Sequence, residues 1–183
     1  IEVKRAEPFD YRFEATFYNG ASHAFRDPYR TLPLLGEEDR YLFNKGKNRE
    51  AYNHLGAHEI TVDGVSGVVF RVWAPEAIRV SVIGDFNAWD GRVHQMRVLG
   101  PSGIWELFIP GIAAGEIYKY EIKTKDRRIL EKADPFQFRA ELRPRTASIV
   151  HSLEYEWNDK VWMEGRRNRS TYRGPVSIYE VHL

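Results

Sequence analysis

The chain of 183 residues is long enough for one domain of ordinary size with flanking segments. Its 27 Lys and Arg against 26 Asp and Glu leave a formal net charge of +1, which argues against nucleic acid or another polyanion as a partner. There is no cysteine for a disulfide framework and no apolar run of the ~20 residues that a membrane span needs, so we expect a cytoplasmic protein without a membrane partner.

The region before Glu59 differs in character from the strand-rich region that follows it. Prolines interrupt the chain between Asp27 and Leu35, which is typical of a linker. The pattern over residues 47–55, followed by Gly56, predicts one short helix. Since the chain does not open on Met, we also expect it to start inside a longer protein.

Short strand signals, each bounded by Gly, Pro or Asp, fill the middle of the chain. The clearest cover residues 68–74, 80–83, 104–109 and 118–123. In the last of these, strict alternation places Tyr118, Tyr120 and Ile122 on one face and charged residues on the other. Strands with one buried and one wet face pack as two sheets. We therefore predict an all-β fold, an immunoglobulin-like β-sandwich over residues 47–154 with partial elements on either side.

A short internal repeat connects the start of the chain with this sandwich. Tyr11 and Asp27 are sixteen residues apart, as are Tyr118 and Asp134, and each Asp is followed by Pro and an aromatic residue. Two related modules explain the match, with chance similarity between two hairpins as the alternative. On this basis residues 1–46 are predicted to be the last hairpin of a preceding β-sandwich with a linker. Asp134 is expected to fix a turn.

The end of the chain turns polar and basic and then apolar. Four arginines stand close together there: Arg166, Arg167, Arg169 and Arg173. We interpret them as a solvated face or as ion-pair partners of another domain, because the overall charge is balanced. Trp157 and Trp162 lie in the same segment and are expected to pack it onto a neighbouring domain. The final stretch, Ser177–Leu183, is predicted to be a strand with nothing after it.

One loop signal carries a tryptophan. Residues 84–91, with the sequence GDFNAWDG, are rich in turn formers, and a large ring there is costly to leave in water. Either Trp89 folds back and anchors the loop, or it forms a platform for a ligand. A sugar suits a platform, because the C–H face of glucose stacks on an indole while Asn87 and Lys119 hydrogen-bond to its hydroxyls. Trp73 and Trp105 stand in alternating strands and are predicted to be core residues.

Nothing in the sequence marks an active site, a metal site or a cofactor. His54 and His58 have the spacing of two metal ligands on a helix, but Gly56 lies between them and no third ligand accompanies them. Glycoside chemistry needs two carboxyl groups across the scissile bond, and none of the 26 acidic residues is marked out by its neighbours. Neither a phosphate-binding glycine loop nor a nucleophile elbow is present. No catalytic residue is assigned.

Five motifs taken together are specific. They are Gly56-Ala57-His58, residues 65–75 (VSGVVFRVWAP), residues 80–91 (VSVIGDFNAWDG), residues 103–111 (GIWELFIPG) and residues 177–183 (SIYEVHL). They resemble the motifs of bacterial 1,4-α-glucan (glycogen) branching enzymes over nearly the whole chain. The resemblance implies a first sandwich, then a second sandwich that is a family-48 carbohydrate-binding module, then a catalytic (β/α)8 barrel of the α-amylase superfamily.

In such an enzyme a nucleophilic Asp and an acid/base Glu cut an α-1,4 linkage and pass the chain to a glucose 6-hydroxyl. The resemblance places both beyond Leu183 and makes residues 155–183 a linker with the first barrel strand. It implies no cofactor. The implied partners are α-glucan, as glycogen or maltooligosaccharide, and the missing barrel and preceding sandwich of the same enzyme. A lone barrel strand and a lone hairpin are expected to expose apolar surface.

The resemblance also implies binding residues. In related glycogen-binding modules a loop Trp and the Lys of the following strand touch glucan, and these positions fall on Trp89 and Lys119. Where dedicated binders have a second Trp, this chain has residues 126–129 (DRRI), so we expect weak binding or a docking role. Two alternatives stay open. One is a regulatory glycogen-targeting module, which the 177–183 motif argues against, and the other is the N-terminal part of a debranching or trehalose-releasing relative.

Overall fold

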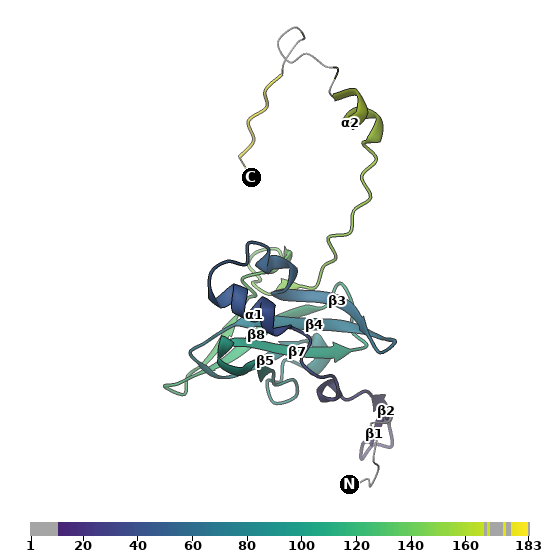
Figure 1. The fold of residues 1–183 in the computed structure, drawn as a ribbon. Coiled ribbons are helices and arrows are strands. Elements are labelled where there is room, and N and C mark those ends of the chain that lie inside the picture. Colours follow the sequence, from purple (N-terminus) through teal and green to yellow (C-terminus); the bar gives the residue numbers. More distant parts are fainter. Residues whose placement is uncertain (1–10, 167, 169–173, 175–176, 183) are drawn as a thin grey trace. The chain divides into compact units, whose positions relative to one another are not determined.

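The computed structural model describes residues 11–166, 168, 174 and 177–182. The chain divides into two compact units, residues 1–152 and residues 153–183 (Figure 1). The expectations that concern residues 1–10, Arg167, Arg169, Arg173 and Leu183 lie outside the described residues.

The first unit is built around two antiparallel sheets. One has the strand order β3-β4-β7-β6, with β3 (Gly56–Val62), β4 (Val65–Trp73), β6 (Arg97–Val98) and β7 (Ile104–Pro110). The other has the order β10-β11-β8-β5, with β9 paired to β8, and consists of β5 (Ala77–Gly84), β8 (Ile117–Thr124), β9 (Ile129–Lys132), β10 (Arg139–Ala140) and β11 (Ser148–Ile149). This arrangement confirms the predicted all-β sandwich, and the four clearest strand predictions fall on β4, β5, β7 and β8.

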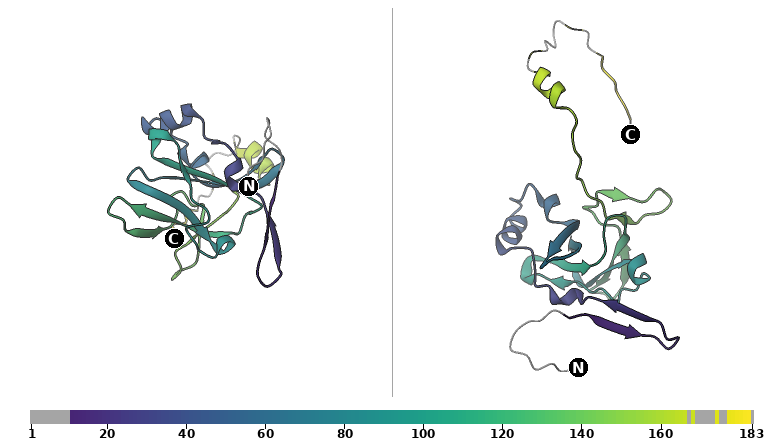
Figure 2. Two further views of the ribbon diagram at one scale, coloured as in Figure 1. Left: turned by 90° about the horizontal axis from the view of Figure 1, so that it is seen from below. Right: turned by 90° about the vertical axis from the view of Figure 1, so that its right-hand side faces the viewer.

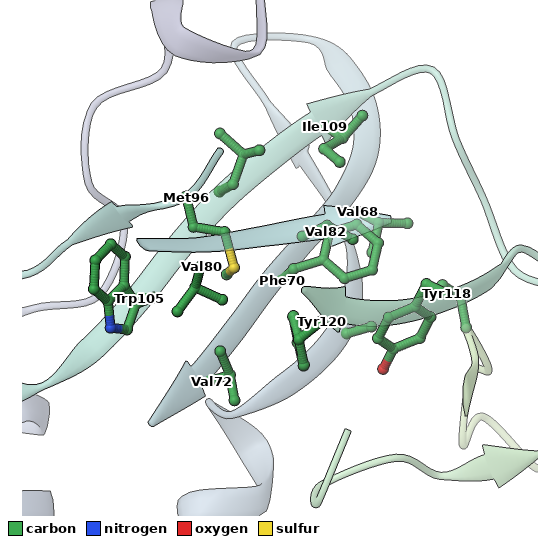
Figure 3. Packing of buried hydrophobic residues seen from close by; sticks show 13 residues of the cluster. Val68, Phe70, Val72, Val80, Val82, Met96, Trp105, Ile109, Tyr118 and Tyr120 are labelled. Atoms are coloured by element: carbon green, nitrogen blue, oxygen red, sulfur yellow. The ribbon is translucent and has the colours of Figure 1, made fainter. Parts of the chain in front are cut away.

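The main core lies between the two sheets and is formed by alternate residues of their strands (Figure 3). Val68 and Phe70 of β4 and Tyr120 of β8 are completely buried in it. Trp105 belongs to the same cluster at 7% exposure, and its Nε1 donates to the carbonyl of Ala74 at 3.0 Å. The core position predicted for Trp105 is confirmed.

Trp73 is not a core residue, so its predicted position is wrong. It follows the buried Val72 in β4, and alternation therefore turns it to the outer side of the sheet, where it is 51% exposed. Its ring meets that of Phe43 edge-on, with 6.1 Å between the centroids. The outer face of this sheet is also covered, and the strand that ends at Trp73 is therefore apolar on both faces. For this reason the sequence pattern does not show which face of the strand points to the main core.

A helix precedes the sandwich, but not at the residues where the sequence pattern placed it. α1 spans Glu37–Asn44, whereas residues 47–55 form only a loop and the 3-10 turn η2 (Ala51–Asn53). The first turn of α1 carries three acidic residues, which are favourable next to the positive end of the helix dipole. Residues 47–55, where the sequence pattern predicted the helix, have no such acidic first turn.

The end of α1 explains the same error. Gly46 has a left-handed φ of 65°. This conformation lets Gly46 N–H reach the carbonyl of Phe43 and Lys47 N–H reach that of Leu42, both at 2.9 Å, which is a Schellman motif. Gly46 is therefore the C-terminal signal of the helix, and Gly56 instead opens β3.

The segments before β3 cover the outer face of the β3-β4-β7-β6 sheet (Figure 1). A second hydrophobic cluster forms there from Leu35, Leu55, Leu99 and Ile104, with Phe43, Ala51 and Phe136 packed against it. Short 3-10 turns connect the larger elements: η1 (Pro28–Arg30), η2, η3 (Asp85–Asn87) and η4 (Gly100–Ser102). The expected linker is thus a fixed part of the folded unit.

A buried ion pair fixes this covering segment. Glu106 and Arg71 are only 2% and 7% exposed and pair at 2.7 Å. The Glu106 carboxylate also accepts the backbone N–H groups of Leu34 at 2.8 Å and Leu35 at 3.0 Å, while Arg71 Nη1 donates to the carbonyl of His54 at 3.1 Å. These bonds satisfy two buried charges that would be costly if left alone.

The chain before η1 forms a hairpin of β1 (Phe13–Thr16) and β2 (Ser22–Phe25), which projects as an arm beside the sandwich (Figure 2). Tyr11 Oη donates to Asp27 Oδ2 at 2.6 Å. The other oxygen, Oδ1, accepts the N–H of Tyr29 at 2.8 Å. The carboxyl group therefore joins the start of the hairpin to the turn that follows it.

The sandwich contains the same arrangement sixteen residues apart. Tyr118 Oη donates to Asp134 Oδ2 at 2.7 Å, and Asp134 Oδ1 accepts the N–H of Phe136 at 2.8 Å. Here the carboxyl group is buried, and it also accepts a 3.0 Å hydrogen bond from Tyr120 Oη while its backbone N–H donates to Ser148 Oγ. Burial raises the pKa of Asp134. The prediction that Asp134 fixes a turn is confirmed.

The second unit contains α2 (Lys160–Arg166). Residues 177–182 have no regular secondary structure in this chain, and the strand expected for Ser177–Leu183 as part of a barrel stays a prediction. A strand needs a hydrogen-bonded neighbour, and no described residue pairs with this segment. Trp157 and Trp162 are 71% and 48% exposed. Across the described residues, no helix has the length and apolar character needed to cross a membrane.

Candidate functional site

The loop after β5 holds Trp89 in an unusual backbone conformation. The chain leaves β5 at Gly84, forms the turn η3, and then places Ala88 and Trp89 in the left-handed region at φ values of 53° and 59°. Bulky residues rarely adopt this region, and each such residue costs roughly 1–3 kcal/mol unless its surroundings enforce it. The Trp89 N–H donates to the carbonyl of Gly84 at 2.9 Å, which closes the loop.

The side chain of Trp89 is anchored at its polar edge and partly open elsewhere. Its Nε1 donates to Asp85 Oδ1 at 2.8 Å, and 37% of the residue is exposed. Trp89 therefore combines the two alternatives that the sequence left open. Its indole anchors its own loop, and part of the residue stays exposed to solvent, as a ligand platform requires. A satisfied N–H on a fixed ring is a suitable arrangement for stacking.

Asn87 lies beneath the loop rather than on its surface. It is 9% exposed, and its Oδ1 accepts the N–H of Gly84 at 3.0 Å. Its Nδ2 donates to the carbonyl of Val82 at 2.9 Å and lies 3.0 Å from His94 Nδ1. The amide that the sequence offered to a sugar is thus occupied with holding the loop.

These contacts also assign the state of His94. The carbonyl of Val82 can only accept and the N–H of Gly84 can only donate, so the orientation of the Asn87 amide is fixed. His94 Nδ1 must therefore accept from that amide, which only a neutral ring with its proton on Nε2 can do. Burial lowers the pKa of His94, in agreement with a neutral ring.

Asp90 shapes the outer turn of the loop. Its Oδ1 accepts the backbone N–H of Arg92 at 2.9 Å, and its Oδ2 accepts from Arg92 Nη2 at 2.6 Å. The Arg92 side chain, through these hydrogen bonds, lowers the pKa of Asp90 to about 2. The turn therefore keeps its charge pair across the physiological pH range.

Lys119 lies on the outer face of the neighbouring strand. In the register of β5 and β8 it stands opposite Ile83, and Glu121 follows it on the same face. The loop crosses this face, because a Cβ on Gly91 would lie 2.6 Å from Glu121 Oε2. The structure therefore brings the Trp89 loop over the face that carries Lys119, with Asn87 underneath as support.

Three residues of this site were not identified from the sequence. Asp85 fixes the indole of Trp89, His94 fixes Asn87, and Glu121 lies under Gly91 and pairs with Arg79. The Asp four residues before the Trp was a visible signal. The other two depend on tertiary contacts. No group of three or more His, Cys, Asp or Glu that could hold a metal occurs within the described residues.

The sandwich, with a fixed and partly open Trp on one loop, has the features of a carbohydrate-binding module. Residues 54–137 match the family model of carbohydrate-binding module 48 (isoamylase N-terminal domain). Over most of its length the chain is similar in sequence to part of bacterial 1,4-α-glucan branching enzymes, in line with its motifs.

Three relatives illustrate the similarity. The 1,4-α-glucan branching enzyme GlgB of Synechococcus sp. (strain JA-2-3B'a(2-13)) is 58% identical over 87% of this chain and 22% of that protein. GlgB of Thermosynechococcus vestitus is 54% identical over 91% of this chain and 22% of that protein. GlgB of Nitrosococcus oceani is 47% identical over 98% of this chain and 24% of that protein. The chain thus spans about a fifth of the length of the curated relatives that it matches.

Proposed function

We propose that the chain is the non-catalytic, glucan-binding and docking part of a branching enzyme. The parent enzyme forms α-1,6 branches by cutting α-1,4-glucan and transferring the cut chain to a glucose 6-hydroxyl. The observation that carries the binding role is the left-handed backbone that presents the Trp89 ring while Asp85 satisfies its N–H. We place this function in the cytoplasm, which suits a chain without cysteine.

Trp89 supplies the stacking surface in this proposal. The C–H face of a glucose unit packs on the indole, and the Lys119 ammonium on the outer face of β8 donates to a sugar hydroxyl. Asn87 supports the loop without contacting the sugar, because its amide is hydrogen-bonded to the backbone of Gly84 and Val82. A neutral polysaccharide also suits a chain with a net charge of +1.

The affinity is expected to be modest. Where the resemblance implies a second Trp, the β8–β9 hairpin turns through Arg127 at φ 64° and is held by an Asp126–Arg128 ion pair at 2.5 Å. Ile129, at 50% exposure, offers a smaller apolar surface than an indole ring. A single platform contributes on the order of 1 kcal/mol beyond its buried area, so a Kd in the millimolar range or slightly below is expected.

Docking within the parent enzyme is the second candidate, and the hairpin favours it. Phe13 and Phe25 lie side by side with 5.5 Å between their centroids, and both are more than 40% exposed. By the sixteen-residue repeat, Phe13 corresponds to Tyr120, which is completely buried in the sandwich core. We therefore propose that residues 1–46 contain the last hairpin and linker of a preceding β-sandwich, whose other strands would cover this face.

The segment after the module supports docking in the same way. Tyr155 and Trp157 meet edge-on at 4.9 Å, yet they are 70% and 71% exposed. We propose residues 47–154 as the carbohydrate-binding module and residues 155–183 as a linker followed by the first strand of a (β/α)8 barrel. Ile178 and Tyr179 are about 90% exposed. In the barrel their backbone would be hydrogen-bonded to neighbouring strands and their side chains would be buried.

Calorimetric titration of the purified chain with maltoheptaose and with glycogen tests the binding role. The variant Trp89→Ala removes the platform, and Trp73→Ala removes another exposed tryptophan as a matched control. Binding that is lost in the first variant and kept in the second supports a glucan platform at Trp89. Equal binding by all three proteins would place the glucan site away from Trp89, and no binding by the unchanged chain would leave docking as the function.

A further inference from the structure

Tyr29 connects the segment before the sandwich to the loop that carries Trp89. Its phenol donates to the carbonyl of Val93 at 3.4 Å, and its own carbonyl accepts from Arg97 Nη2 at 3.2 Å. Val93 lies on the returning arm of the loop, where its N–H donates to the carbonyl of Asp90 at 3.1 Å. Tyr29 therefore contacts the turn that immediately follows Trp89.

Tyr29 is in turn fixed from the hairpin side. Its N–H donates to Asp27 Oδ1 at 2.8 Å, and the other oxygen of that carboxyl group accepts from Tyr11 Oη at 2.6 Å. A continuous series of hydrogen bonds thus runs from the hairpin through Asp27 and Tyr29 to the carbonyl of Val93. The three residues of this series, Tyr11, Asp27 and Tyr29, all precede residue 54, where the match to the family model begins.

Val93 is 48% exposed, so few side-chain contacts hold this point of the returning arm. The residues after it are held by β5, because Val82 N–H donates to the His94 carbonyl at 3.0 Å and Met96 N–H donates to the Val80 carbonyl at 2.8 Å. A cavity of about 800 Å³ separates the hairpin from this end of the sandwich, and Phe86, Val93 and His94 of the loop line it together with Tyr29. Side chains next to a cavity lack the dispersion contacts of a close-packed interior. A loop that holds Ala88 and Trp89 in left-handed backbone needs surroundings that enforce this conformation.

We infer that Tyr29 is a positioning residue for the glucan platform, through which the segment before the module sets the conformation of the Trp89 loop. The inference rests on the proposed function of Trp89. It adds that glucan affinity depends on a residue outside the module itself, which touches no sugar. The coupling acts through the carbonyl of Val93 and the guanidinium of Arg97.

The test combines two readouts on the full chain. Maltoheptaose affinity is measured by calorimetry, and hydrogen exchange is followed at the amides of residues 85–93 and at the Trp89 indole N–H. The variants are Tyr29→Ala and the milder Tyr29→Phe, which loses only the phenol hydrogen bond. Tyr41→Ala is the matched control, because Tyr41 is similarly exposed, 57% against 46%, and lies on α1.

Tyr29→Ala is expected to weaken maltoheptaose binding about threefold to tenfold and to speed exchange in the loop by a similar factor, since it removes both the phenol hydrogen bond to Val93 and the contacts of the ring. Tyr29→Phe is expected to show a smaller change in the same direction with an unchanged melting temperature. Unchanged affinity and unchanged loop exchange in both variants, or an equal effect of Tyr41→Ala, would overturn the inference. If the unchanged chain binds no glucan, the proposed function fails, while loop exchange still decides whether Tyr29 sets the loop.

Discussion

The hydroxyl of Tyr118 and the carboxylate of Asp134 are joined by a 2.7 Å hydrogen bond inside the sandwich core. Tyr11 and Asp27 form the same bond at 2.6 Å in the hairpin, where the Asp is only partly buried. The same motif thus stands in two environments within one chain. Since the cost of breaking a hydrogen bond depends on whether the partner is left buried, the two copies should differ in their contribution to stability.

Replacing Asp134 is expected to be much more costly than replacing Asp27. Asp134→Ala removes the acceptor of the buried Tyr118 hydroxyl and leaves the Tyr120 hydroxyl only its 3.5 Å contact with the Arg71 carbonyl, so the free energy of unfolding is expected to fall by about 2–4 kcal/mol. Asp27→Ala leaves groups that water can reach and is expected to cost about 1 kcal/mol or less. Urea denaturation of both variants measures the difference, and equal costs would contradict this account.

Glu106 is expected to hold the covering segment of residues 33–55 on the sandwich. Glu106→Ala leaves the buried Arg71 guanidinium without its carboxylate partner and two backbone N–H groups unsatisfied, so a loss of about 3–5 kcal/mol is expected. Glu76→Ala, which breaks the exposed pair with Lys125, is the control and is expected to change stability by less than about 1 kcal/mol. Denaturation together with limited proteolysis checks both. Protection of the segment in Glu106→Ala at the level of the unchanged chain would refute its role.

Gly84 is expected to be needed for the shape of the loop. A Cβ there would meet the carbonyl of Ile117 and lie 2.6 Å from the Phe86 ring, so Gly84→Ala must displace backbone at the start of the Trp89 loop. Gly67→Ala, in the other sheet, would similarly meet the Phe108 ring at 2.8 Å. Both are expected to cost about 1–3 kcal/mol.

Glucan titration distinguishes the two glycine variants. Only Gly84→Ala changes the backbone that leads to Trp89, so it alone is expected to weaken maltoheptaose binding, whereas Gly67→Ala lowers the melting temperature without affecting affinity. A parallel loss of affinity in both variants would mean that binding follows global stability rather than the shape of this loop.

Much of this fold could be read from the sequence, because the strands follow simple alternation bounded by turn formers. Tyr118, Tyr120 and Ile122 stand on the core face as alternation predicts, and Asp134 fixes its turn. The position of α1 could not be read as reliably, since its acidic first turn and Gly46 compete with a similar pattern ten residues later. Single helices of eight residues have weak signals.

The site was only partly readable, for a different reason. Trp89 is visible because a large ring in a turn-rich loop is unusual, but the role of Asn87 is decided by its burial beneath the loop and by His94, a tertiary contact. Alternation turns Trp73 outward, and the sequence does not show that α1 brings Phe43 against its ring there. Glu106 and Arg71 looked like ordinary charged strand residues until the covering segment supplied their partners.

The loop is expected to respond to pH through His94. Burial lowers the folded-state pKa of this imidazole below its ordinary value of 6.5, so the unfolded chain takes up the proton at a higher pH than the folded chain. The free energy of unfolding is therefore expected to fall as pH drops through about 6.5 and to level off below the lowered pKa. A protonated Nδ1 would also face the Asn87 amide, and the loop is expected to loosen over the same range.

Denaturation between pH 8 and pH 5 measures this dependence. The control is His94→Asn, whose amide oxygen keeps an acceptor close to the position of Nδ1 without taking up a proton. Burial also lowers the pKa of His58, so a residual slope is expected in this variant. An unchanged slope after the substitution would show that His94 does not contribute to the pH dependence.

The most direct test of a glucan platform at Trp89 is a map of amide and indole NMR shifts during titration of the 15N-labelled chain with maltoheptaose. The account predicts that the largest changes fall on the Trp89 indole N–H, on the loop amides of residues 85–93 and on Lys119, and that Trp73 and Trp157 stay unchanged. Shifts concentrated on the hairpin or on Trp157, or no shifts at millimolar ligand, would contradict a glucan platform at Trp89 and favour a module that only docks.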